Sequence, residues 1–225
     1  MRFIIGLLVL LTAGPGYARR PDIEITPFLG YRWGGGIEVQ ERAFRGRDYD
    51  VTVDPSGSYG LRVGLDLTTR LQVEILASRQ DSKLQDEYGL FGEEPGGFFP
   101  QGDTDVIDYS VSSVHVGVLW HFTSGANRLY GTVSTGIVYT DPALPLPSER
   151  SFSLGAGGGI KMDLTEHQGL RFELRCTWAD TDGAARAVAQ FEHPDCPAGA
   201  DCEYIYLGRD SLIQTEVMLG YSLRI

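Results

Sequence analysis

Residues 152–178 read FSLGAGGGIKMDLTEHQGLRFELRCTW, and this stretch decides the fold that we expect for the chain. Apolar side chains occupy alternate positions on both sides of a turn at 165–169. A period of two is typical of a strand, because successive side chains of an extended chain point to opposite faces. Each half runs for about ten residues, longer than the usual strand of roughly five to six and close to the nine to eleven or so that cross a bilayer at a tilt. The stretch predicts a transmembrane β-hairpin.

The two faces of this hairpin differ in chemistry along its whole length. The apolar face carries Phe152, Leu154, Ala156, Ile160, Met162, Leu164, Leu170, Phe172, Leu174, Cys176 and Trp178. The opposite face carries Ser153, Gly155, Gly157, Gly159, Lys161, Asp163, Arg171, Glu173, Arg175 and Thr177. An apolar face suits lipid and a polar face suits the inside of a membrane barrel.

The same alternation recurs along the rest of the chain and brings the total to eight strands. The further strands are expected over 22–33, 58–67, 71–80, 108–122, 128–140 and 211–225. The connections between successive strands are in turn long, short, long, short, moderate, short and long. Short periplasmic turns and long outer loops are typical of bacterial outer-membrane barrels. We therefore expect an all-β fold, an eight-stranded antiparallel up-and-down transmembrane β-barrel with both termini at the periplasmic end.

The strand over 108–122 changes phase in its first half. Val114, Val116 and Val118 share one parity, whereas Tyr109 and Val111 have the other. We expect either a bulge at this point or a strand that rises above the membrane.

Large aromatic residues gather at both ends of the expected strands. One band, beside the long or moderate loops, contains Tyr31, Trp33, Tyr59, Tyr139, Phe152 and Trp178, and the other contains Trp120, Phe122 and Tyr221. Two such girdles are expected where a barrel crosses the two membrane–water interfaces.

Composition excludes several classes of protein. The net charge of -11 over 225 residues argues against a nucleic-acid partner, because phosphates favour a basic surface. The 42% of hydrophobic residues are patterned, which argues against disorder. No apolar run after the N-terminus approaches the roughly 18 residues of a membrane helix.

Residues 1–18 are typical of a secretory signal peptide, and residues 19–225 are expected to form the barrel domain. Arg2 precedes an apolar run over 3–11, and small residues end the segment at 16–18. Export to an oxidising compartment would make a disulfide between Cys196 and Cys202 possible. We interpret Cys176 as a small hydrophobic residue on the apolar face. We expect no cofactor and no metal site, because the histidines and cysteines lack zinc spacing.

With the strands placed, the chain resembles the small eight-stranded outer-membrane β-barrel domains of the OmpA/OmpW-like type, without a peptidoglycan-binding domain. The resemblance spans nearly all of residues 19–225 and rests on short motifs. They are PFLGY at 27–31, YGLRVG at 59–64, GAGGGIK at 155–161 and GYSLRI at 220–225.

The resemblance implies an assembly signal in the last strand and a set of partners. Gly220, Tyr221, Leu223 and Ile225 match the pattern that the barrel insertion machinery reads, although Ile225 stands where Phe is common. Periplasmic chaperones, that machinery, outer-membrane lipid and lipopolysaccharide are the expected partners of a protein that acts as a monomer in the Gram-negative outer membrane.

The inward-facing charges are the candidate functional residues. They are Glu24, Arg32, Arg62, Asp66, Glu74, Lys161, Asp163, Arg171, Glu173, Arg175, Glu216 and Arg224. In a barrel of about eight strands the interior is only wide enough for side chains, and an unpaired buried ion is costly. We expect opposite charges to pair and plug the barrel, which favours a structural or surface-interacting role. A narrow passive pore for small solutes is the alternative.

Four further alternatives follow from other features. His115 and His121 face inward, so a lipid-modifying enzyme is conceivable, but Ser112 and His115 diverge and no His-x-Ser spacing is present, so we expect no enzyme. An external ligand could bind the outer loops through Phe91, Phe98 and Phe99, and the acidic segment 81–108 could bind divalent cations. A soluble barrel of the lipocalin type would show the same alternation with its apolar face turned inward.

Overall fold

The computed structural model describes residues 22–41, 48–86, 106–142, 148–181, 205–207 and 210–225. The strands are β1 (Ile23–Trp33), β2 (Gly36–Glu41), β3 (Asp48–Val53), β4 (Ser56–Asp66), β5 (Leu71–Asp86), β6 (Val106–His121), β7 (Asn127–Pro142), β8 (Glu149–Asp163), β9 (Gln168–Thr181), β10 (Ile205–Leu207) and β11 (Asp210–Arg224). No helix in these ranges is long and apolar enough to span a membrane.

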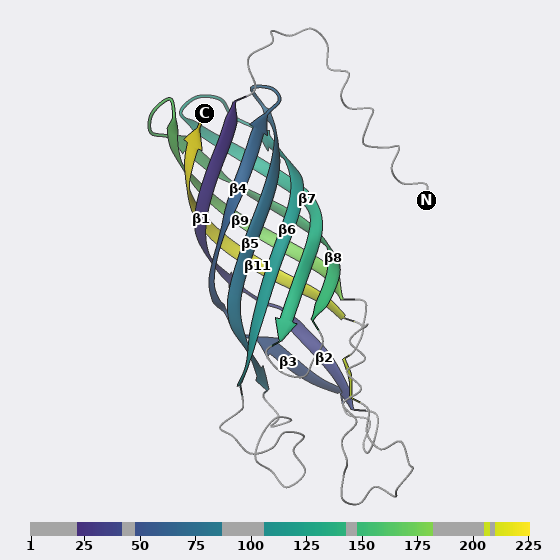
Figure 1. The fold of residues 1–225 in the computed structure, drawn as a ribbon. Helices are drawn as coiled ribbons and strands as arrows, with labels where there is room; N and C mark the ends of the chain where they lie inside the picture. Colours follow the sequence, from purple (N-terminus) through teal and green to yellow (C-terminus); the bar gives the residue numbers. More distant parts are fainter. Residues whose placement is uncertain (1–21, 42–47, 87–105, 143–147, 182–204, 208–209) are drawn as a thin grey trace, which may run out of the picture.

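Eight of the strands close into an antiparallel barrel, as the alternation predicts (Figure 1). Around the wall the order is β5-β4-β1-β11-β9-β8-β7-β6, and pairing of β5 with β6 closes the ring. The eight-stranded up-and-down barrel is therefore confirmed. Closure leaves no open edge among these strands, and each backbone in the wall is hydrogen-bonded on both sides.

The short turns and the C-terminal end of β11 lie at one end of the barrel, and β2 and β3 lie at the other (Figure 1). Residues 67–70, 122–126 and 164–167 form these short turns. The long connections leave from the opposite end, where Gly34 and Gly35 turn β1 into β2 with φ of 85° and 100°. Glycine adopts these positive φ values without strain. We refer to the two ends as the short-turn end and the long-loop end.

Three strands lie in segments that the sequence analysis treats as loops. β2 and β3 fall within 34–57, and β10 falls within 180–209. β3 pairs with β5 over Val51–Val53, β2 pairs with β3, and β10 pairs with β2. β3 pairs with the extension of β5, which continues six residues beyond the expected end at Gln80 to Asp86, and β2 and β10 add to β3 in turn. Strands that pair with partners far away in the chain cannot be predicted from a local sequence pattern.

Of the two alternatives for the strand over 108–122, the bulge is wrong, and the strand instead continues toward the long-loop end. β6 pairs without interruption with β5 and with β7, and Tyr109 and Val111 face the interior with His115. The apparent change of phase arises because some apolar side chains face the interior at the long-loop end. Opposite this part of β6, Arg79 and Asp81 are exposed on the outer face of β5, so both strands continue beyond the apolar part of the wall.

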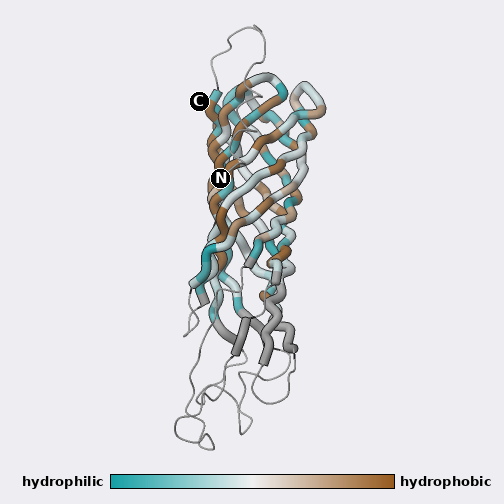
Figure 2. The backbone as a smooth tube through the Cα atoms, turned by 90° about the vertical axis from the view of Figure 1, so that its right-hand side faces the viewer, coloured by the Kyte–Doolittle hydropathy of each residue, from teal (hydrophilic) through white to brown (hydrophobic). Residues whose placement is uncertain are grey.

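The outer wall is apolar and the interior is polar, so the lipocalin-type alternative is wrong. Leu29 is 70% exposed and Val133 is 64% exposed, whereas Glu24 and Lys161 are each 2% exposed. Figure 2 shows hydrophobic and hydrophilic residues alternating along the strands. A soluble protein would bury the first pair and expose the second.

The aromatic residues on the outer wall lie near the two ends, as the sequence predicts. Tyr31, Tyr59 and Phe152 are exposed toward the long-loop end, and Trp120 and Phe122 are exposed toward the short-turn end. Between these two bands the wall presents an apolar belt, which includes Val116, Val118, Val133, Leu154, Leu174 and Ile137.

Candidate functional site

The candidate site is the barrel interior, where nine charged side chains are buried. Each is between 1% and 5% exposed, and each belongs to at least one ion pair. They are Glu24, Arg32, Arg62, Glu74, Lys161, Arg171, Glu173, Arg175 and Glu216. The structure places the other sequence-derived candidates, Asp66, Asp163 and Arg224, half-buried inside the short-turn end.

The central ion pair joins opposite walls of the barrel. Arg171 on β9 binds both carboxylate oxygens of Glu74 on β5, with Nη2 3.0 Å from Oε2. These two strands are four positions apart in a ring of eight, so the pair crosses the full width of the lumen. A bidentate guanidinium–carboxylate pair has fixed geometry as well as charge attraction.

Glu173 contacts all three central arginines. Its carboxylate accepts from Arg62 at 2.8 Å, from Arg171 at 2.7 Å and from the Tyr130 hydroxyl at 2.7 Å, and Arg175 lies 3.7 Å away. Arg62 also approaches Glu74 at 3.5 Å. Two glutamates are therefore shared among three arginines, and every carboxylate oxygen of Glu173 has a partner.

A second layer of charge lies toward the short-turn end. The Lys161 ammonium donates to Glu24 at 2.6 Å and to the side-chain oxygen of Gln72. Arg224, at the C-terminal end of β11, donates to Glu24 at 3.2 Å and also to Asp163. Lys161 lies 3.9 Å from the Glu74 carboxylate and so connects this layer to the central cluster.

A third layer lies toward the long-loop end. Arg32 donates to Glu216 at 3.0 Å and to the Ser78 hydroxyl at 2.8 Å. Ser78 in turn hydrogen-bonds Ser113 at 2.8 Å, and the Ser58 hydroxyl donates to Glu216. The buried charges of this layer are thus paired and further supported by hydroxyl groups.

The glycines on the inner face of β8 make room for these side chains. A Cβ at Gly155 would lie 2.5 Å from Nη2 of Arg175, and one at Gly159 would lie 2.7 Å from the Tyr130 hydroxyl. At Gly159 the added atom would also overlap the Phe172 carbonyl oxygen, so this position needs glycine, whereas at Gly155 the Arg175 and Ser134 side chains would have to shift.

Two apolar groups share the interior with the charges. Phe28, Leu76 and Met218 form a buried cluster, and the Arg62 guanidinium lies 5.4 Å from the centre of the Phe28 ring. Nearer the long-loop end, the interior is lined by Tyr109, Val111, Val138, Ala179 and Leu212. None of these residues was a candidate from the sequence, although their parity along each strand matches that of the inward charges.

Comparison with known proteins identifies the family. The family model described as outer membrane protein beta-barrel domain matches residues 7–192. The chain belongs to this outer-membrane β-barrel family. Its location is therefore the outer membrane of Gram-negative bacteria, and the apolar belt of this barrel faces lipid. No curated protein matches the sequence.

Solved structures of outer-membrane barrels are similar to this one. OprG from Pseudomonas aeruginosa has a TM-score of 0.62 with 15% identity, over 91% of this chain and 96% of OprG. Neisserial surface protein A has a TM-score of 0.49 with 10% identity, over 90% and 97%. The protease OmpT from Escherichia coli has a TM-score of 0.48 with 10% identity, over 94% and 99%. At these identities the likeness to OprG shows the fold alone.

His115 contacts two serines inside this outer-membrane barrel. Its Nε2 lies 3.1 Å from the Ser153 hydroxyl and its Nδ1 lies 3.1 Å from the Ser134 hydroxyl. The Nδ1 side also faces the Arg175 guanidinium at 3.5 Å, where a catalytic triad would have a carboxylate. Ser112 faces away from His115, as expected. The two partner serines lie on other strands, so no spacing in the sequence could have revealed them.

The last strand closes the barrel between β1 and β9. Gly220 faces inward, where a Cβ would meet Thr26 at 2.6 Å, while Tyr221, Leu223 and Ile225 point outward. These residues have the placement that an assembly signal requires, and the recognition itself stays a prediction.

Several sequence-derived candidates lie outside the described residues. They are the signal peptide over 1–18, the cysteines Cys196 and Cys202, and the loop phenylalanines Phe91, Phe98 and Phe99. Within the described ranges, no group of three or more His, Cys, Asp or Glu residues could hold a metal ion. Cys176 is a free thiol on the outer wall.

Proposed function

We propose that this outer-membrane barrel has a structural or surface-interacting role and that paired charges plug its interior. The observation that carries the proposal is the Arg171–Glu74 pair, which crosses the lumen between opposite strands. Two further pairs, Arg62–Glu173 and Lys161–Glu24, each join strands three positions apart in the ring. Side chains that bridge the lumen occupy the space that a solute would need.

The energetics of buried ion pairs support a plug that stays closed. Opening a path past Glu74 would separate it from Arg171, Arg62 and Lys161, all of which are buried. Leaving one partner of a buried pair uncompensated costs about 3–5 kcal/mol. A state with several such pairs broken would be rare at equilibrium.

The long-loop end supports a role at the cell surface. β2, β3 and β10 extend the sheet from β5 beyond the barrel wall (Figure 1). If the short turns are periplasmic, as is usual for this family's architecture, this sheet projects from the cell. A sheet extension of this kind can carry contacts with external partners. We propose no specific ligand.

We also propose that the protein acts as a monomer without catalytic activity. The closed ring satisfies its own strand edges, so folding requires no second copy. The Ser153–His115 contact lacks an orienting carboxylate, and Ser153 has no exposed surface. Assembly would proceed through periplasmic chaperones and the insertion machinery, with β11 as the recognised strand.

Single-channel conductance in planar bilayers tests the plug. The wild-type barrel, refolded and checked for heat-modifiable mobility, is compared with the Glu74→Gln/Arg171→Gln variant. We expect no reproducible conductance steps from the wild type. The exposed pair Arg79–Asp81 supplies a control, because the Arg79→Gln/Asp81→Asn variant removes equal charge outside the interior.

Steps from the wild type that change in the Glu74→Gln/Arg171→Gln variant, but not in the control, would make the protein a narrow passive pore. In that case the interior charges would act in selectivity rather than in closure. A silent wild type with steps only in the double variant would support the plug directly.

A further inference from the structure

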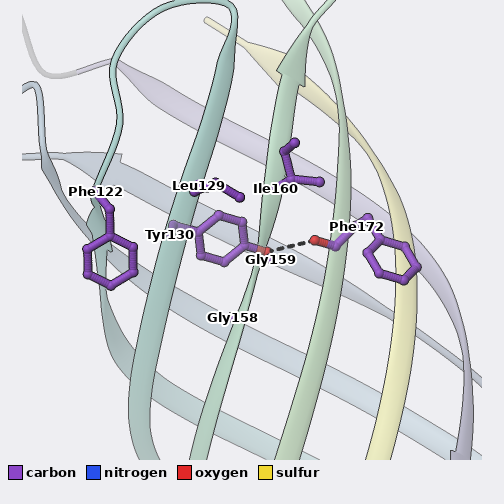
Figure 3. Close-up of a pocket in the computed structure, with 7 residues that line it drawn as sticks. All are labelled: Phe122, Leu129, Tyr130, Gly158, Gly159, Ile160 and Phe172. Atoms are coloured by element: carbon purple, nitrogen blue, oxygen red, sulfur yellow. Dashed lines mark hydrogen bonds between the residues drawn. The ribbon is translucent and has the colours of Figure 1, made fainter.

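An apolar groove lies on the outer wall, near the short-turn end. It has a volume of about 460 Å³, and side chains of Phe122, Leu129, Ile160 and Phe172 surround Gly158 (Figure 3). This volume falls in the range of roughly 300–1,000 Å³ that small-molecule pockets occupy. The groove faces away from the charged interior and takes no part in the proposed plug.

Gly158 lines the groove, and its neighbour Gly131 leaves room for the Phe122 ring at the edge. Gly131 on β7 and Gly158 on β8 are Cα partners, and both point outward because Tyr130 and Thr132 point inward. In the same row of the wall, Trp120 pairs with Gly131 and Leu174 pairs with Gly158. In this row, two adjacent positions without side chains therefore lie between the large side chains of Trp120 and Leu174.

Large side chains form the rim of the groove. A Cβ at Gly131 would lie 3.0 Å from the Phe122 ring, which therefore borders the glycine. Leu129 pairs with Ile160, and Ile160 pairs with Phe172, so these three form the rim on the side of the short turns. The floor is the backbone of β7 and β8, with the Tyr130 ring behind it (Figure 3).

The surroundings of the groove identify its occupant. Phe122, Leu129 and Phe172 belong to the exposed apolar surface that faces lipid, so the groove is continuous with the protein–lipid interface. An apolar hollow does not hold water, and an empty one forfeits dispersion contacts with its lining. A flexible hydrocarbon chain can supply those contacts.

We propose that the groove binds one acyl chain of a phospholipid from the periplasmic leaflet. With the short turns periplasmic, as proposed above, the leaflet follows from Phe122 in the short turn at 122–126 and from Leu129 beside it. The inference depends on the outer-membrane location, and it holds whether the interior is a plug or a pore. The bound chain fills the space above Gly158, between the rings of Phe122 and Phe172.

Trp120 provides a reporter within the protein. The chain has three tryptophans, and Trp120 is the Cα partner of Gly131 at the groove. The Trp33→Phe/Trp178→Phe variant leaves Trp120 as the single emitter. Its fluorescence is measured in vesicles of dioleoylphosphatidylcholine with increasing fractions of the chain-brominated analogue, since bromine quenches only nearby tryptophan.

Substitution of Gly158 tests the groove against a matched control. A Cβ at Gly158 meets only the Tyr130 carbonyl oxygen, at 3.2 Å, so Gly158→Leu extends into the hollow. Ala156→Leu adds a leucine at the next outward position of the same strand. If Gly158→Leu does not fold, Gly158→Val replaces it in the test.

We expect Gly158→Leu to lose part of the Trp120 quenching at each brominated fraction and Ala156→Leu to retain all of it. Equal quenching in all three proteins would overturn the proposal. Quenching that rises in Gly158→Leu would also overturn it, because the groove would then be covered by protein in the wild type. Cross-linking in the same vesicles would detect a second copy as that cover.

Discussion

Arg171 and Glu74 meet across the full width of the barrel. They lie 97 residues apart in the chain and on opposite walls, and the guanidinium engages both oxygens of the carboxylate. Each side chain is almost completely buried. A charge pair of this kind ties the two walls together, so its removal should affect both stability and the closed state of the interior.

Glu74→Gln should destabilise the folded barrel by about 3–5 kcal/mol, because it leaves buried arginines without their counter-charge. The shift is measured as the urea midpoint of the barrel in lipid vesicles, read from heat-modifiable mobility. Asp81→Asn is the control: its partner Arg79 is exposed, and such a pair contributes only about 0–1 kcal/mol. Equal midpoints for the two variants would contradict the central role of Glu74.

Phe28→Ala should destabilise the barrel by about 3–5 kcal/mol, since it opens a cavity in the interior cluster with Leu76 and Met218. It also removes the ring beside the Arg62 guanidinium. Leu29→Ala, one residue along the strand, removes a side chain that faces lipid and should cost less. Urea unfolding in vesicles compares them, and a larger loss for Leu29→Ala would reverse the assignment of inside and outside for β1.

Gly60→Ala should impair folding because the added Cβ would lie 2.2 Å from the Ala77 carbonyl oxygen and 2.5 Å from the Phe28 ring. Overpacking of this kind typically costs about 1–3 kcal/mol. Gly57→Ala on the same strand meets nothing within 4 Å and should fold normally. The folded fraction after dilution from urea into vesicles measures both. Normal yield of Gly60→Ala would show that β4 and β5 are not packed as the structure describes.

Cys176 should react only with reagents that enter the bilayer, because it lies in the apolar belt between Ala156 and Thr215. In the Cys196→Ser/Cys202→Ser variant this thiol is the sole target. A neutral pyrene maleimide should label the folded barrel in vesicles, and a sulfonated maleimide should label it only after unfolding. Labelling of the folded barrel by the charged reagent would place Cys176 outside the membrane.

Local alternation was enough to predict the wall of this protein. Lys161 and Arg171 could be assigned to one face and Phe172 to the other, because side-chain direction in a strand depends only on position parity. The same rule predicted the eight strands of the barrel, its apolar exterior and the charged side chains inside it. It misled in the first half of β6, where Tyr109 and Val111 are apolar yet inward. The polarity of a side chain indicates only indirectly whether it faces lipid or the interior. The indication fails where apolar side chains face the interior.

Contacts between strands depended on the tertiary structure. The sequence placed Glu74 and Arg171 inside, but their meeting is a consequence of strand register and of ring closure, which put β5 opposite β9. Register also brings Ser153 to His115. These relations join residues that are far apart in the chain, so no local pattern encodes them.

The sequence by itself determined which side chains face lipid and which face the lumen, because that depends on a period of two within each strand. Only the tertiary structure decided which charges pair, that β2 and β3 extend the sheet, and that a groove lies above Gly158. The physical reason is that pairing needs two strands in a defined register, and register is set by closure of the whole barrel.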